Sequence, residues 1–233
     1  MTTLRIQIVD YRLGNLFSIR QACQRIGIDA VVSSSPQSFD SVDGIILPGV
    51  GAFGNAMESL RELNLISSLR TFAASGKPLL GICLGMQLLF DESEEFGRHE
   101  GLGILPGTVR RIPDQTLAGR RLRVPNVGWN PVARSNSGVA DRVLEGIADD
   151  EFMYFVHSYC AVPADSADVL TSTTYGSIRY CSAVRRGHIL GVQFHPEKSA
   201  GAGLRILKNW ARELSDRSAP GQPEPVSRQP AKH

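Results

Sequence analysis

A thiol between two glycines is the residue in this chain best suited to chemistry. In Gly81-Ile82-Cys83-Leu84-Gly85, it follows a short apolar run and precedes a helix-like segment. A strand, a sharp turn and a helix in this order form a nucleophile elbow, which lifts the residue at the turn out of the core. Backbone amides at a helix N-terminus favour a thiolate there. The alternative is an inert cysteine at the end of a core strand, the commoner fate of a lone thiol. The paired glycines favour Cys83 as a nucleophile.

A histidine and a carboxylate stand two positions apart after a later apolar run. His195 and Glu197 follow Phe194, with Pro196 stiffening the turn between them. An imidazole can keep a thiol ionised and protonate a leaving group, and a carboxylate behind it can fix its tautomer. Taken alone, a His-x-Glu segment is more typical of an exposed turn whose side chains face solvent. Together with the Cys83 elbow, it favours a Cys83, His195, Glu197 triad, in a chain order that differs from Ser, Asp, His.

A glycine-rich segment, Pro48-Gly49-Val50-Gly51-Ala52-Phe53-Gly54, contains the spacing G-x-G-x-x-G. This spacing can bind a dinucleotide, but only on a first strand with an acidic residue about twenty positions further on, and the chain lacks both features. The segment can instead supply backbone amides to an oxyanion. The amides of Val50 and Leu84 are the candidates for that role. An ordinary glycine-rich turn remains the alternative.

The first ninety residues alternate apolar runs with helix-like segments. We expect strands at 4–9, 31–32, 44–47 and before Cys83. Helices are expected at 16–26, capped by Asn15 and ended by Gly27, and at 60–74 and 84–90. This alternation predicts a parallel sheet covered on both faces. Sites in such sheets lie at the carboxyl ends of the strands, so Asp10, the segment 48–53 and Cys83 are predicted to share one rim.

Between residues 103 and 182 the pattern changes to short alternating runs. These runs predict antiparallel strands at 121–124, 152–156, 169–173 and 182–185, followed by a strand at 189–194 and a helix at 203–214. The sequence therefore predicts an α/β fold with a mainly parallel central sheet, flanking helices and a small antiparallel excursion. We expect one domain over residues 1–215 and a disordered Pro-rich tail over 216–233.

Composition excludes several classes of protein. The 233 residues carry a net charge of only +2, and no basic stripe interleaves with aromatics, which argues against nucleic-acid binding. No apolar run is long enough for a membrane span, and no signal peptide is recognisable. The four cysteines are far apart and form no CxxC pair, so neither a metal site nor a disulfide framework is expected. A reducing cytoplasm fits best.

The elbow, the late His-Pro-Glu and the glycine segment together resemble class I glutamine amidotransferases, over residues 4–214. Within this class the chain is similar to the glutaminase subunits of imidazole glycerol phosphate synthase. The narrower resemblance rests on Met86 and on four segments: Asp10-Tyr11-Arg12-Leu13-Gly14-Asn15, Pro48-Gly49-Val50-Gly51-Ala52-Phe53, Pro125-Asn126-Val127-Gly128-Trp129-Asn130 and Tyr154-Phe155-Val156-His157-Ser158-Tyr159. Two positions depart from those subunits: Asn126 replaces a usual histidine and Cys160 a usual aromatic residue.

The resemblance implies a three-layer fold and hydrolysis of glutamine through a thioester on Cys83, without metal or cofactor. It also implies an ammonia-accepting cyclase subunit, a (β/α)8 barrel, which makes imidazole glycerol phosphate in histidine biosynthesis and activates the glutaminase. Gly49, Gly51, Gln87, Ser158 and Tyr159 would hold glutamine, and Asn126, Trp129 and Lys198 would face the cyclase.

Several alternatives stay open at this stage. Gln87 could be an ordinary helix residue, Trp129 could belong to the core, and Lys198 could be a solvated charge. The chain could be the glutaminase subunit of an anthranilate or aminodeoxychorismate synthase, which the segments 48–53 and 128–130 disfavour. A stand-alone cysteine hydrolase, such as a papain-like peptidase, would use the same thiol and imidazole but would act alone on peptides.

Overall fold

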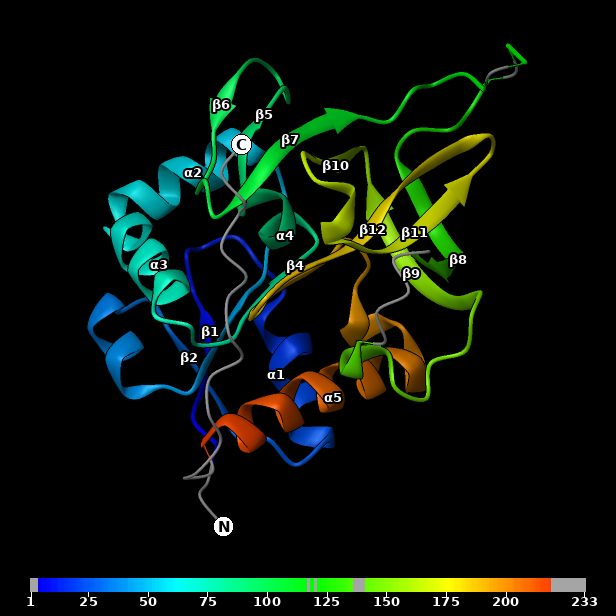
Figure 1. The fold of residues 1–233 in the computed structure, drawn as a ribbon. Coiled ribbons are helices and arrows are strands. Elements are labelled where there is room, and N and C mark those ends of the chain that lie inside the picture. Colours follow the sequence, from blue (N-terminus) through cyan, green and yellow to red (C-terminus); the bar gives the residue numbers. More distant parts are fainter. Residues whose placement is uncertain (1–3, 117, 120, 136–140, 219–233) are drawn as a thin grey trace, which may run out of the picture.

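A mixed nine-stranded sheet forms the centre of the computed structural model, which describes residues 4–116, 118–119, 121–135 and 141–218 (Figure 1). One half of the sheet is parallel. Its strands, in spatial order, are β2 (Ala30–Ser33), β1 (Ile6–Val9), β3 (Gly44–Leu47), β4 (Leu79–Ile82) and β13 (Ile189–Val192). The parallel sheet predicted for the first ninety residues is therefore confirmed. It also recruits β13, which pairs with β4 so that Val192 lies opposite Ile82.

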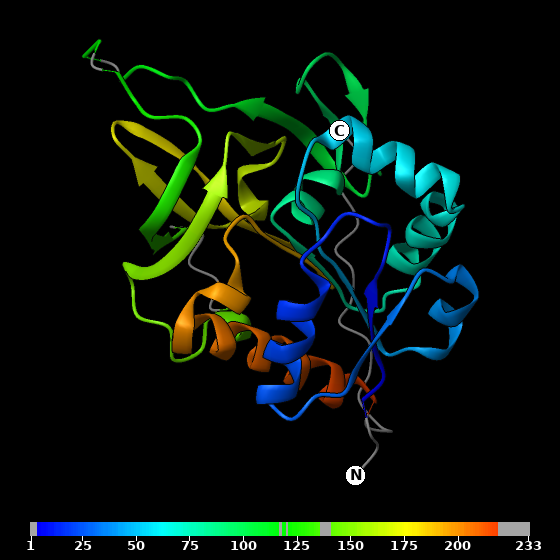
Figure 2. The ribbon, with the colours of Figure 1, turned by 180° about the vertical axis from the view of Figure 1, so that it is seen from behind.

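Helices cover both faces of this half, because alternate residues along its buried strands point to opposite sides. Ile8 packs with α1 (Leu16–Arg25) and α5 (Ala200–Ser218), which lie together on one face (Figure 2). Val9 belongs to a second cluster on the other face, with α2 (Phe53–Glu62), α3 (Leu65–Ala74) and α4 (Leu84–Leu88). The result is the predicted arrangement of helix, sheet and helix layers.

The other half of the sheet is antiparallel. Its strands continue outward from β13 as β12 (Ile178–Arg186), β11 (Val169–Tyr175), β8 (Asn126–Arg134) and β9 (Glu151–His157). A separate four-stranded sheet contains β10 (Tyr159–Pro163), β7 (Leu105–Arg111), β5 (Phe90–Ser93) and β6 (His99–Glu100). The antiparallel part is thus larger than the small excursion predicted from the sequence.

Short 3-10 helices complete the described part of the chain. They are η1 (Pro36–Ser41), η2 (Arg142–Leu144), η3 (Ser166–Asp168) and η4 (Pro196–Lys198). Of these, η4 follows β13 and contains Glu197, so it bears directly on the predicted triad.

Several predicted boundaries were wrong. The expected helix at 60–74 is two helices, α2 and α3, separated at Asn64, which adopts a left-handed conformation with φ 55° that no continuous helix can contain. The helix after Cys83 ends at Leu88, and β5 takes up Phe90. No strand covers 121–124, where Arg121 forms only an isolated bridge with Gln115.

The C-terminal helix begins earlier and ends later than predicted. It runs over Ala200–Ser218, so the first residues assigned to the tail are helical. The rest of the expected disordered tail, 219–233, lies outside the described residues. No helix in the described part of the chain is both long and apolar enough to cross a bilayer.

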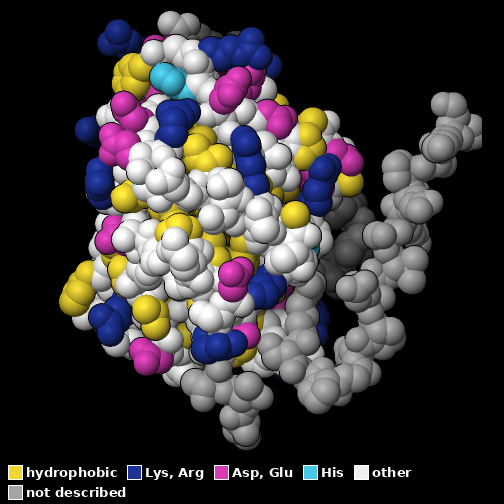
Figure 3. Space-filling model, turned by 90° about the vertical axis from the view of Figure 1, so that its left-hand side faces the viewer, with side chains coloured by type: hydrophobic (Ala, Val, Ile, Leu, Met, Phe, Trp, Pro, Cys, Tyr) yellow, Lys and Arg dark blue, Asp and Glu magenta, His cyan; other side chains and the backbone are white. Residues whose placement is uncertain are grey.

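Acidic and basic side chains are interspersed on the side of the molecule that carries α3 (Figure 3). A cavity of about 340 Å³ lies between η1 and α3, lined by residues that include Phe39, Phe72 and Lys77. The Lys77 ammonium already donates to the backbone oxygens of Asp40 and Val42. This cavity does not include Cys83, so the candidate site is sought elsewhere.

Candidate active site

Cys83 occupies a strained turn between β4 and α4, as the elbow motif predicts. Its φ of 54° and ψ of −110° are unfavourable for a residue with a side chain, and its backbone N–H donates to the Val192 oxygen at 2.7 Å. A Cβ at Gly85 would lie 1.9 Å from the Leu47 oxygen, and one at Gly81 would lie 2.8 Å from the Gly85 oxygen. The two glycines therefore let helix and strand approach closely enough to form the elbow.

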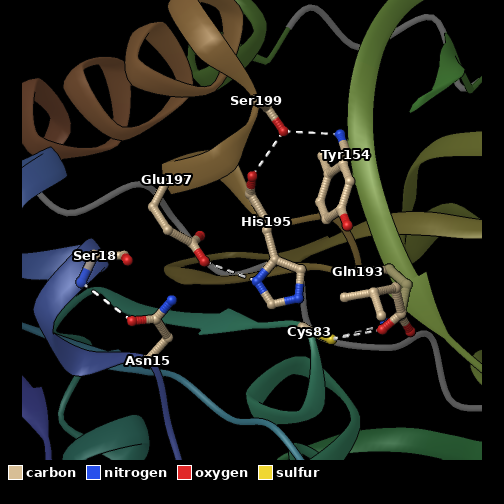
Figure 4. Close-up of polar contacts among 9 residues, drawn as sticks. Asn15, Ser18, Cys83, Tyr154, Gln193, His195, Glu197 and Ser199 are labelled. Atoms are coloured by element: carbon tan, nitrogen blue, oxygen red, sulfur yellow. Dashed lines mark hydrogen bonds and ion pairs between the residues drawn. The ribbon is translucent and has the colours of Figure 1, made fainter. Parts of the chain in front are cut away.

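His195 and Glu197 form an almost completely buried pair at the end of β13. The Nδ1 atom of His195 lies 2.8 Å from Oε1 of Glu197, and their side chains are 3% and 1% exposed (Figure 4). The Ser199 hydroxyl donates to the His195 oxygen at 2.7 Å and accepts from the Tyr154 N–H at 3.0 Å. Glu197 thus fixes the ring, and Ser199 fixes the backbone that carries it.

The charges around His195 favour its protonated form. Burial opposes the imidazolium, but interaction with the Cys83 thiol and the Glu197 carboxylate outweighs burial and raises the pKa of His195 to about 10. Nε2 is the ring nitrogen that faces away from Glu197. It is buried, and no group in the described part of the chain forms a hydrogen bond with it. The imidazole and the thiol are close enough to influence each other, and Nε2 remains available for a proton transfer.

The Cys83 sulfur itself is held from another direction. The Gln193 side-chain nitrogen donates to it at 3.6 Å, and the thiol lies 3.9 Å from the Val156 oxygen (Figure 4). Gln193 belongs to the same chain segment as His195 and is completely buried. Sequence analysis missed it, although its place in Gly191-Val192-Gln193-Phe194-His195 puts a polar side chain inside an otherwise apolar run.

A cavity of about 250 Å³ opens beside Cys83. Its lining includes six residues predicted from the sequence to stabilise the oxyanion or to hold substrate: Val50, Gly51, Leu84, Gln87, Ser158 and Tyr159. The structure therefore brings together segments from β3, α4 and β9 at one rim. Gly49 does not face the cavity in the same way. A Cβ there would lie 2.3 Å from the Tyr11 hydroxyl and 2.8 Å from the Leu84 Cβ, so Gly49 allows the segment 48–53 to pack closely against Tyr11 and α4.

Two further polar residues line this cavity and were not identified from the sequence. One oxygen of Glu95 accepts from the Phe53 N–H at 2.7 Å, which anchors this carboxylate to the first residue of α2. His157 is buried behind the cavity, and burial lowers its pKa to about 4. Glu95 lies in a loop with a mixed charge pattern, and only the fold shows that this loop borders the site.

The residues expected to face a partner lie in different environments. Trp129 is 49% exposed on β8 and packs edge-on against Tyr154, and the Lys198 ammonium lies 5.8 Å above the Tyr154 ring. Asn126, in contrast, is 1% exposed, and its amide donates to the Tyr180 hydroxyl at 3.0 Å. The side chain of Asn126 therefore faces the interior in this structure.

Comparison with known proteins identifies the family. The sequence profile of the family "Glutamine amidotransferase class-I" matches residues 7–214, which include Cys83, His195 and Glu197. The chain belongs to the class I glutamine amidotransferases. The glutamine amidotransferase function predicted from the sequence is therefore confirmed at this level.

Within the class I glutamine amidotransferases, the chain belongs to the HisH family. It is 47% identical to an imidazole glycerol phosphate synthase subunit HisH from Sulfurimonas denitrificans, over 89% of this chain and 97% of the relative. It is 43% identical to the HisH subunit of Aquifex aeolicus, over 90% and 97%. Both alignments span nearly the whole of each relative, so the match covers the complete fold of those subunits.

Solved structures of more distant amidotransferases share the fold. PurLQS from Thermotoga maritima matches with a TM-score of 0.68 at 20% identity, covering 91% of this chain and 100% of that one. A Trypanosoma brucei CTPS glutaminase domain matches with a TM-score of 0.60 at 19% identity, covering 90% and 94%. These matches confirm the predicted class I glutamine amidotransferase fold.

Proposed function

We propose that this glutamine amidotransferase is the glutaminase subunit of an imidazole glycerol phosphate synthase, and that it hydrolyses glutamine at Cys83. The observation that carries the proposal is the buried His195–Glu197 pair beside the elbow thiol, since that thiol lines a cavity of about 250 Å³. The assignment to this synthase rests on the relatives that are named as its subunits.

In the first step, the Cys83 thiolate attacks the side-chain carbonyl carbon of glutamine. The new C–S bond turns the carbonyl oxygen into an oxyanion, and the amides of Val50 and Leu84 stabilise it. His195 is protonated because its pKa is raised to about 10, and it gives its Nε2 proton to the departing nitrogen. The C–N bond breaks, ammonia leaves, and a thioester remains on Cys83.

In the second step, the now neutral His195 takes a proton from water, which attacks the thioester carbon. The C–S bond breaks, glutamate is released, and the proton on His195 restores the ion pair with the Cys83 thiolate. Glu197 holds the ring in one orientation throughout, since its hydrogen bond at 2.8 Å fixes Nδ1. The reaction needs no group outside the chain besides glutamine and water.

Glutamine is held by groups around the cavity. The Glu95 carboxylate borders the cavity and can pair with the α-ammonium group of an amino acid. Gly51, Ser158 and Tyr159 also line the cavity. Gln87 uses its side-chain nitrogen internally, donating to the Tyr159 oxygen at 2.8 Å and to Gln193 Oε1 at 2.9 Å, so it offers substrate only its carbonyl oxygen.

The partner is a cyclase subunit that accepts the ammonia before water protonates it. Exposed apolar side chains gather on one face of the β8–β9 pair, where Val127, Trp129 and Phe152 are 57%, 49% and 53% exposed. Lys198 follows His195 and reaches this face at Tyr154. Because this face adjoins the His195 end of the site, a subunit docked there would receive ammonia over a short path. Asn126 would contribute from beneath the face.

The experiment is reconstitution with a histidine-pathway cyclase. Cys83→Ala should abolish synthesis from glutamine while leaving synthesis from added ammonium salt, because only ammonia production needs the thiol. Cys23→Ala is the matched control: it removes a buried thiol from α1, and both activities should survive. Retained glutamine-dependent synthesis in Cys83→Ala would refute the mechanism. Activation by a chorismate-converting partner and not by the cyclase would instead identify an anthranilate or aminodeoxychorismate synthase subunit.

A further inference from the structure

A buried chain of side-chain amides ends on the Cys83 sulfur. Gln87 donates from Nε2 to the Tyr159 oxygen and to Oε1 of Gln193, and Gln193 donates from its own Nε2 to the sulfur at 3.6 Å. Gln193 is 0% exposed and Gln87 is 4% exposed. Neither amide is therefore free to turn in solvent, and their hydrogen bonds depend on one another.

The direction of the Gln193 amide is determined by Gln87. An amide has one oxygen that accepts and one nitrogen that donates. Since Gln87 presents N–H to Gln193, the oxygen of Gln193 must face Gln87, and its nitrogen must face the thiol. If Gln193 were flipped, its oxygen would oppose the sulfur lone pairs and its nitrogen would oppose the Gln87 nitrogen.

We propose that Gln193 is a further functional residue of the glutaminase reaction, which donates a hydrogen bond that stabilises and orients the Cys83 thiolate, and that Gln87 is the positioning residue that keeps Gln193 in this direction. The thiol form has a weak acceptor in the Val156 oxygen at 3.9 Å, but a thiolate has no proton to give it. On ionisation the sulfur therefore depends on donors. Gln193 supplies one from the side of β13, and protonated His195 is available as a second.

The roles of the two donors differ. The His195 proton moves to the leaving nitrogen, so it is absent for part of the cycle. A glutamine amide does not titrate, and Gln193 can hold the sulfur while the thioester forms and breaks. Gln193 is also not among the residues that line the cavity, so its effect should fall on the sulfur and not on glutamine binding.

The first test measures the thiol directly and needs no partner subunit. The rate at which iodoacetamide alkylates Cys83 is followed against pH, with the Cys83 peptide quantified by mass spectrometry. Gln193→Met keeps the length of the side chain and removes the donor. We expect the midpoint of the alkylation profile to rise by about one pH unit, which is a tenfold loss of thiolate at a given pH. Gln87→Met should move it in the same direction by less, because Gln193 keeps its donor but loses its fixed direction.

Asn209→Met is the matched control. Asn209 is a buried amide that donates to the oxygens of Val143 and Glu145, far along the chain from the site, so its loss should leave the midpoint unchanged. A folded Gln193→Met with an unchanged midpoint would overturn the proposal. If Gln193→Met does not fold, the alkylation midpoint of Gln87→Met is the deciding measurement. An unchanged midpoint in Gln87→Met would also overturn the proposal.

The second test rests on the proposed function and uses the complex with the cyclase. Gln193→Met should lower kcat for glutamine about tenfold with little change in KM, and ammonium-dependent synthesis should be unaffected. A rise in KM alone would assign Gln193 to substrate binding and refute the thiol role. Because alkylation is measured without cyclase or glutamine, a wrong pathway assignment would leave the first test intact.

Discussion

The Nδ1 atom of His195 lies 2.8 Å from Oε1 of Glu197, and neither side chain is more than 3% exposed. A histidine this deeply buried would ordinarily be neutral. The neighbouring Cys83 side chain and the Glu197 carboxylate reverse that tendency and raise the pKa of His195, as the proposed mechanism requires of the group that protonates the leaving nitrogen.

Removing the charge of Glu197 should disable this proton donor. Glu197→Gln preserves the shape of the side chain but can present an N–H to His195 and disturb its tautomer. We expect kcat to fall by about 100- to 10,000-fold, as in other triads that lose their carboxylate. The pKa of His195 should also fall, so the alkaline limb of the kcat profile should move to lower pH. Steady-state rates of the complex against pH measure both effects, and an unmoved alkaline limb would contradict the role given to Glu197.

His157 should make the protein less stable in mild acid. Its Nδ1 lies 2.8 Å from the Tyr159 oxygen, its Nε2 lies 3.2 Å from the Tyr180 hydroxyl, and burial lowers its pKa from 6.5 to about 4. The unfolded chain binds a proton at this residue below pH 6.5, whereas the folded protein resists it until about pH 4. Stability from His157 is therefore complete above pH 6.5 and decreases as the pH falls toward 4, by about 3 kcal/mol in total.

The contribution of His157 to this loss of stability can be isolated with His157→Asn, whose amide can still donate to the Tyr159 oxygen. Urea unfolding at several pH values should show a shallower loss of stability between pH 6.5 and 4 for this variant than for the parent protein. Parallel curves for the two proteins would show that His157 does not resist protonation.

Gly49 should tolerate no side chain. A Cβ at this position would lie 2.3 Å from the Tyr11 hydroxyl, 2.8 Å from the Leu84 Cβ and 3.0 Å from the Gly85 nitrogen. The Tyr11 hydroxyl also donates to the Pro48 oxygen at 2.6 Å, so a shift of Tyr11 would release the segment 48–53, whose amides are proposed to hold the oxyanion. We expect Gly49→Ala to lower kcat at least tenfold and to lower the melting temperature. Gly201→Ala, where a Cβ would meet nothing within 4 Å, is the control and should change neither.

Trp129 should dominate docking of the cyclase. It is half exposed at the centre of the apolar face on β8 and β9, and aromatic residues in such positions carry much of the energy of an interface. Trp129→Ala should weaken cyclase binding about 30-fold, measured by calorimetry, without changing the melting temperature. Phe96→Ala removes an 85% exposed aromatic from the loop between β5 and β6, outside this face, and should leave binding unchanged. Equal losses in both variants would argue against the β8–β9 face as the docking surface.

Sequence reasoning grouped Cys83, His195 and Glu197, which lie close together in the structure, because each belongs to a short local motif. Cys83 needs glycines on both sides, and His195 and Glu197 need only a turn after a strand, so each signal is complete within a few residues. Glu95 and Gln193 carry no such signal, because a carboxylate in a charged loop and one glutamine in an apolar strand become informative only when the fold places them beside the thiol.

The errors in the predicted fold have a similar origin. No glycine or proline interrupts residues 60–74, and only the packing of α2 against α3 shows that the chain turns at Asn64. The alternation at 121–124 is typical of a strand, but within the described residues only the isolated bridge between Arg121 and Gln115 forms there. The size of the antiparallel half depends on partners distant in sequence, which a single sequence does not reveal.

The pairing of β13 with β4 has a consequence for biosynthesis of the protein itself. During translation the thiol leaves the ribosome more than one hundred residues before its imidazole, and the two meet only when the last strand inserts beside the elbow. Until then the nascent polypeptide carries the cysteine without its imidazole. Hydrolytic capacity arises in a single late event, and a prematurely terminated chain has none.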